Sequence, residues 1–113
     1  KLTFFSAGSY EYLKTSTKRS KGNQKRFTII EEPNDKAIKK SKKLGYLPKE
    51  QNGSVNENRG DFLPSTTQMA IDYLSSRSTN GFFLMVEGAR IDKSAHNNDY
   101  SAVVREVLDF DKA

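Results

Sequence analysis

The apolar residues of this chain fall into short runs and helical stripes that are separated by polar stretches. Two β-prone segments, 2–8 and 27–30, predict strands in the first half of the chain. A third run, Phe82–Val86, is continuously apolar and follows the turn pair Asn80-Gly81. This pattern predicts a strand that is covered on both faces.

A lysine-rich segment with a narrow apolar stripe predicts the first helix, over residues 35–44. Asn34 or Asp35 can serve as its N-cap. Gly45 stands where a glycine C-cap is expected. We therefore expect a surface helix that ends at Gly45.

Two further helices are predicted in the second half of the chain. The segment 63–75 has apolar residues at three- and four-residue intervals, and Ser65 to Gln68 forms a capping-box pattern at its start. Another helix begins near Asp99 or Ser101. Its buried face is expected to consist of its apolar residues, namely Val103, Val104, Val107, Leu108 and Phe110.

The order of these elements indicates the fold class. The polar segments 14–25 and 48–62 are rich in turn-forming residues and predict loops. Strands that alternate with helices are typical of α/β proteins. We expect an α/β fold that forms a piece of a doubly wound, mostly parallel sheet flanked by helices.

Ligand-type side chains follow the third apolar run. Glu87 stands at its end, where open α/β sheets place functional residues, and Asp92 and His96 follow four residues apart. On a helical turn that spacing brings two side chains to one face, near enough to share a cation. Imidazole and carboxylate suit zinc, whereas a lone carboxylate suits magnesium equally well. Taken alone, a solvated loop with an N-cap aspartate is the commoner explanation.

The run from Gly81 to Asp99 resembles the metal-binding signature of the alkaline phosphatase family, in which Val-Glu-Gly, a residue pair, Ile-Asp and then His after three residues recur. The similarity continues into 63–75 and 104–113, which resemble the helices on either side of that signature. The segment 63–113 is therefore the part most similar to the family. Residues 1–113 are expected to form part of an alkaline-phosphatase-like catalytic domain.

The resemblance implies roles for four residues. Glu87 corresponds to a magnesium ligand, and Asp92 and His96 correspond to two ligands of a catalytic zinc ion. Lys93 corresponds to a position that contacts phosphate in some bacterial members, the alternative being a surface lysine beside the metal loop. The implied cofactors are Zn²⁺ and Mg²⁺, and the implied substrate is a phosphate monoester.

The sequence also departs from the family pattern. The family nucleophile lies in an Asp-Ser-Ala type stretch, but no Asp-Ser pair occurs in this chain, and Ser94 is not assigned that role. His96 is the only histidine, so none remains for a second zinc site. We expect a segment that is inactive alone, from a homodimeric parent enzyme that is periplasmic or secreted.

Composition restricts the other classes of protein. The chain has 113 residues, of which 35% are hydrophobic, so it has the length of one small domain with a modest core. The absence of cysteine excludes disulfides and thiolate ligands. No apolar run has the length that spans a bilayer, and no membrane partner is expected. The chain starts at Lys1 without methionine and ends within a helical pattern, so an excised piece is expected.

The net charge of +5 is unevenly distributed. Residues 1–50 contain 13 lysines and arginines against 5 acidic residues, whereas residues 51–113 contain 6 against 9. A basic half attracts phosphate esters or nucleic acid, but no aromatic residues are interleaved for base stacking, so no nucleic-acid partner is expected. The alternative to an enzyme segment is a non-catalytic binding module that holds anionic partners with this basic half.

Overall fold

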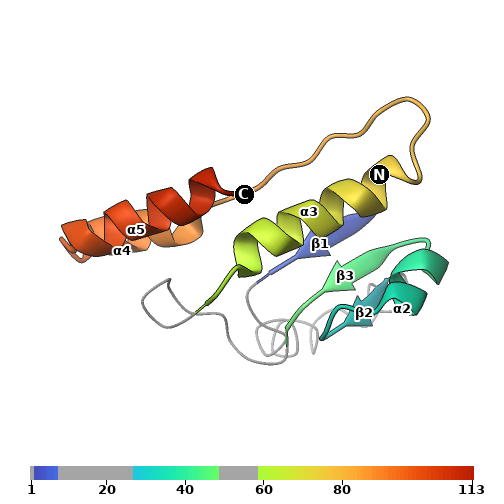
Figure 1. The fold of residues 1–113 in the computed structure, drawn as a ribbon, viewed down its shortest axis with the longest axis horizontal. Coiled ribbons are helices and arrows are strands. Elements are labelled where there is room, and N and C mark those ends of the chain that lie inside the picture. Colours follow the sequence, from blue (N-terminus) through green and yellow to red (C-terminus); the bar gives the residue numbers. More distant parts are fainter. Residues whose placement is uncertain (1, 8–26, 49–58) are drawn as a thin grey trace. The chain divides into compact units, whose positions relative to one another are not determined.

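A computed structural model of the chain describes residues 2–7, 27–48 and 59–113 (Figure 1). The predicted loop 14–25 and most of the predicted loop 48–62 lie outside these residues. The chain divides into two compact units, residues 1–52 and 53–113, which we call unit 1 and unit 2.

Unit 1 contains a three-stranded parallel sheet. Its strands are β1 (Phe4–Ser6), β2 (Thr28–Ile30) and β3 (Leu44–Tyr46), in the order β1-β3-β2. Both outer strands pair with β3 in the parallel sense. The strands predicted within 2–8 and 27–30 are confirmed. The parallel sheet confirms the α/β fold class.

Helix α2 (Asp35–Lys40) begins as predicted but ends earlier. Asn34 is the N-cap, and its Oδ1 accepts a hydrogen bond from the Ala37 amide at 2.9 Å. The C-cap is Ser41, so the predicted extension to residue 44 and the C-cap role of Gly45 are wrong.

Gly45 instead occupies the middle of the central strand. A β-carbon at Gly45 would lie 2.6 Å from Ile29 Cδ1 and 2.7 Å from Phe5 Cζ, which are side-chain atoms of the two outer strands. Leu44, one residue earlier, is fully buried. Because Gly45 has no side chain, the Phe5 and Ile29 side chains of the neighbouring strands can pack directly against the backbone of β3. Pairing with strands distant in sequence overrides the local C-cap signal.

Helix α3 (Phe62–Ser75) in unit 2 starts with Asp61 as N-cap, four residues before Ser65, the N-cap of the predicted capping box. That box is wrong, because Ser65 Oγ donates to the Phe62 carbonyl and Gln68 Nε2 donates to Asp72 Oδ1. Pro64 lies in the first turn, where proline is tolerated. The amphipathic character is confirmed by the buried Ala70 and Tyr73.

The segment Phe82–Val86 is an extended connection between α3 and α4, and the prediction of a doubly covered strand is wrong (Figure 1). Phe83 is 88% exposed and Met85 is 76% exposed. The physical reason is pairing: no strand among the described residues forms a ladder with this segment.

Helix α5 (Tyr100–Asp111) begins where predicted, but it buries the opposite face. The Asp99 carboxylate accepts a hydrogen bond from the Ala102 amide at 2.9 Å and caps the helix. The prediction of a buried apolar face is wrong, since Val104, Val107 and Leu108 are exposed. The buried face of α5 instead consists of Ala102, Glu106 and Asp109. Phe110 is also among the exposed residues. Within the described residues, no helix has the length and apolar character needed to cross a bilayer.

The close approach at Gly45 predicts a steric effect. We expect Gly45→Ala to lower the free energy of unfolding by about 1–3 kcal/mol, the usual cost of overpacking. Urea unfolding followed by circular dichroism measures this change. In the background Phe5→Leu/Ile29→Val, which removes both opposing atoms, the same substitution should cost clearly less. An equal cost in both backgrounds would exclude the steric explanation.

Tyr46 on β3 predicts a loss of stability at alkaline pH. Burial raises the pKa of the Tyr46 phenol above its ordinary value of 10.0, and the Glu32 carboxylate raises it further. The unfolded chain therefore ionises first, so this contribution to stability is intact below pH 10.0 and is lost as the pH rises through the folded-state value. Thermal unfolding across this range should be less pH-dependent in Tyr46→Phe. The control Tyr100→Phe, which removes an exposed phenol, should behave as the wild type.

Candidate functional site

The predicted metal loop is a regular helix, α4 (Ala89–His96). Gly88 is its N-cap residue and makes no side-chain cap. Asp92 lies in the first turn and His96 in the last, the ends at which a helix dipole favours an acidic and a basic side chain. The helix thus holds both ligand-type residues on one rigid element.

The structure brings Asp92 and His96 together on one face of α4. His96 Nε2 lies 3.5 Å from Asp92 Oδ2. The Asp92 side chain is 81% exposed and the His96 side chain is 78% exposed, so both are open to an incoming ion or molecule. This proximity confirms the geometric expectation that followed from their four-residue spacing.

The separation of these two atoms fits a shared metal ion. Zinc ligand bonds of about 2.0–2.1 Å in tetrahedral geometry place two ligand atoms roughly 3.3–3.4 Å apart. The observed 3.5 Å is close to that value. The donor set, one imidazole nitrogen and one carboxylate oxygen, is also one that zinc accepts.

Glu87 is not part of this pair. It lies exposed at the end of the extended segment, before the N-cap Gly88. In residues 2–7, 27–48 and 59–113, no three acidic, histidine or cysteine side chains gather into a group that could hold a metal. The described residues therefore bring together two ligand-type side chains, and the magnesium role of Glu87 stays a prediction.

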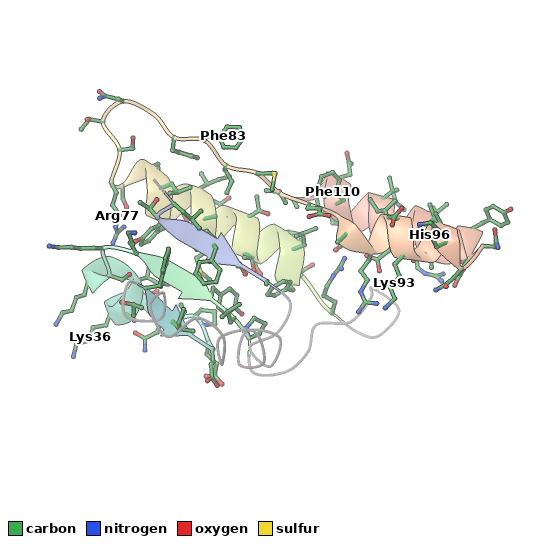
Figure 2. The ribbon with its side chains drawn as sticks, turned by 180° about the vertical axis from the view of Figure 1, so that it is seen from behind. Lys36, Arg77, Phe83, Lys93, His96 and Phe110 are labelled. Atoms are coloured by element: carbon green, nitrogen blue, oxygen red, sulfur yellow. The ribbon has the colours of Figure 1, made fainter. Side chains whose placement is uncertain are left out.

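Two neighbours of the pair lie on the same helix. Lys93 is exposed beside Asp92, and Figure 2 shows it on α4 with His96. Ser94 is buried. Lys93 is thus the residue of α4 that can offer an ammonium group near the pair, and its contact with phosphate stays a prediction.

Helix α4 is tied closely to α5. The link between them is three residues long, and Asn98 and Asp99 donate backbone hydrogen bonds to the Ala95 and Ser94 carbonyls at 2.9 and 3.1 Å. Asn98 has a φ of 55°, a conformation that asparagine tolerates. At the other end, a β-carbon on Gly88 would lie 3.2 Å from the Phe110 ring. The two helices therefore pack along their lengths.

A buried ion cluster in unit 2 was not predicted from the sequence. Arg59 Nη2 contacts Glu106 Oε2 at 2.8 Å and also contacts Asp109 Oδ2. The sequence pattern that could have predicted it is the pair Glu106 and Asp109, three positions apart on the face of α5 opposite Val104 and Val107. Arg59 itself lies within the predicted loop 48–62.

The basic half of the chain gives no comparable arrangement where it is described. Lys36, Lys39, Lys40 and Lys42 are exposed on and after α2, while many other basic residues lie outside the described part. Lys43 stands over the Phe27 ring, 5.1 Å from its centroid. The binding-module alternative stays a prediction.

Comparison with known proteins decides the family. The model of the family described as "Alkaline phosphatase" matches residues 9–113, which include both units. The chain belongs to the alkaline phosphatase family. The matched residues include Glu87, Asp92, Lys93 and His96.

Individual alkaline phosphatases agree with this result. Alkaline phosphatase 4 of Bacillus subtilis (strain 168) is 37% identical over 81 residues, which are 68% of this chain and 18% of that protein. The structure of alkaline phosphatase from the Antarctic bacterium TAB5 matches with a TM-score of 0.78 at 33% identity, over 99% of this chain and 34% of that chain. A histidine-to-aspartate mutant of the TAB5 enzyme, with Mg bound in the M3 site, matches with a TM-score of 0.79 at 32% identity, over 100% of this chain and 34% of that one.

These comparisons show which fold the chain shares with its relatives and how much of their length it covers. The α/β fold of the chain is that of the alkaline phosphatases. The chain spans about a third of the length of the solved structures and less than a fifth of the Bacillus relative.

Proposed function

We propose that this chain supplies part of the metal centre of an enzyme that hydrolyses phosphate monoesters. The observation that supports this most is the pair Asp92–His96, exposed on α4 with 3.5 Å between ligand atoms, in a segment that the family model matches. In this proposal both residues bind Zn²⁺. Glu87 binds Mg²⁺ and Lys93 contacts the substrate phosphate.

The chemistry of the residues supports these assignments. A bound zinc ion supplies Lewis-acid stabilisation to a phosphoryl oxygen. Asp92 and His96 would fix the position of that ion relative to the phosphoryl oxygen, because both extend from one helix. The Lys93 ammonium adds a positive charge at the same place and compensates charge on the phosphate. A structural neighbour with Mg bound supports the metal dependence.

The remaining parts of the site come from elsewhere in this proposal. The chain contains neither an Asp-Ser pair nor a second histidine, so the nucleophile and further ligands belong to residues outside these 113. These 113 residues alone are then inactive. The complete enzyme is proposed to be a homodimer that acts in the periplasm or outside the cell.

The first prediction concerns metal binding by the chain itself. Co²⁺, a spectroscopic substitute for zinc, should bind the 113-residue chain weakly and shift the ring signals of His96, the only histidine, in NMR spectra. His96→Ala and Asp92→Asn should each weaken binding by at least about tenfold, since even outer-shell changes cost 10–100-fold. Asp111→Asn, which removes an exposed carboxylate of α5, is the matched control. Equal affinity in all four proteins would exclude the pair as ligands.

The second prediction concerns catalysis. With Zn²⁺ and Mg²⁺ added, the 113-residue chain should not hydrolyse p-nitrophenyl phosphate at alkaline pH. A longer product of the same gene should do so, and His96→Ala should lower its kcat/KM by about 10²-fold or more, because transition-state stabilisation by the metal is lost. Lys112→Ala, an exposed change on the same unit, should leave the rate unchanged. Full activity of the His96→Ala enzyme would refute the proposed function.

A further inference from the structure

The Arg59 cluster connects the start of α3 with α5. The side chains of Arg59, Glu106 and Asp109 are only 9%, 3% and 6% exposed. Glu106 and Asp109 lie three residues apart on α5, so one helix face carries both carboxylates. Arg59 immediately precedes the turn that leads into α3. The Arg59 guanidinium group thus contacts two buried carboxylates.

Hydrophobicity alone favours a different rotation of α5. Helical periodicity places Val104, Val107 and Leu108 opposite the buried face, and all three are exposed. Burying these three side chains would be favourable, because burial removes apolar area from water. Carboxylates are costly to bury without a cation, so the contact with Arg59 makes the observed orientation possible. The observed rotation thus keeps the ion contacts and leaves these apolar side chains exposed.

The rotation of α5 determines how α4 is held. The three-residue link and the contact between Phe110 and Gly88 join the two helices at both ends. Asp92 and His96 both extend from α4. Figure 2 shows His96 and Phe110 on these two adjacent helices. A change in the rotation of α5 about its axis would therefore move α4 and change the direction in which the Asp92–His96 pair faces.

We propose that Arg59 is a positioning residue for the Asp92–His96 pair. Through Glu106 and Asp109 it fixes the rotation of α5, and through the packing of α4 on α5 it sets the position of the two ligands within unit 2. The inference rests on the proposed function insofar as the pair binds metal. Its structural part, the setting of α4 by Arg59, can be tested without any metal.

The absence of native cysteine makes that test direct. Ser75→Cys at the end of α3 and Ala95→Cys on α4 introduce two exposed labelling sites. Electron–electron double resonance between two spin labels then reports the distance between α3 and α4. Arg59→Met should shift the distance maximum by about 5–10 Å, comparable with the spacing of packed helices, while helical circular dichroism is retained. Arg59→Lys, which keeps a cation, should retain the original maximum, and an unchanged distribution in Arg59→Met would overturn the proposal.

A second variant covers the case in which Arg59→Met unfolds the helices. Removing Arg59 takes its charge away from two buried carboxylates, and repulsion between them would by itself disturb the helices. The triple variant Arg59→Met/Glu106→Gln/Asp109→Asn has no charge in the cluster. A displaced or broadened distribution is expected there as well. Return to the wild-type distribution would overturn the proposal, because the ion contacts would then not set the helix.

Co²⁺ titration separates this inference from the proposed function. Both ligands lie on α4, so Arg59→Met should leave the Co²⁺ affinity of the chain within about twofold of wild type. A more than tenfold loss would contradict a role exerted through α5. Failure of the wild-type chain to bind Co²⁺ would refute the metal assignment and the metal part of this inference, whereas the distance measurement would still decide the setting of α4.

Discussion

Glu106 and Asp109 occupy the face of α5 on which an ordinary amphipathic helix has its valines and leucines, and Arg59 is the cation that makes their burial tolerable. Breaking a buried ion pair by removing one partner typically costs about 3–5 kcal/mol. That is a large part of the roughly 5–15 kcal/mol by which domains are stable. Burying Val104, Val107 and Leu108 instead would offer about 1.5–3 kcal/mol for each side chain. The apolar gain of the alternative is of the same order, so the observed orientation depends on keeping Arg59 in contact with both carboxylates.

Features of the structure that depend on neighbouring residues could be predicted from the sequence. The N-caps Asn34 and Asp99 accept the expected amide hydrogen bonds because a cap needs only the next three residues. The proximity of Asp92 and His96 follows from the geometry of a single helical turn. The family resemblance of this segment was predictable for the same reason, since its motif is contiguous.

Features that depend on distant residues could not be predicted in this way. A glycine after a lysine-rich stripe is equally typical of a helix C-cap and of a strand that needs close neighbours, and at Gly45 the pairing with β1 and β2 decides. The buried face of α5 depends on Arg59, which is 47 residues from Glu106. The candidate site has the same limit. The proximity of its two ligand-type residues, four positions apart on one helix, was predictable, but the relation of Glu87 to them depends on how the extended segment before α4 is held.

The exposed segment Phe82–Val86 has a consequence for biosynthesis. It combines five apolar residues with no charge and no proline, and Phe83 projects from it (Figure 2). Segments of this kind pair readily with identical segments when their backbone is free. A ribosome delivers residues one after another, so this stretch emerges before anything C-terminal to it can cover it. Exposed Phe83 and Met85 therefore make this stretch a place where nascent chains can associate until later residues have been made.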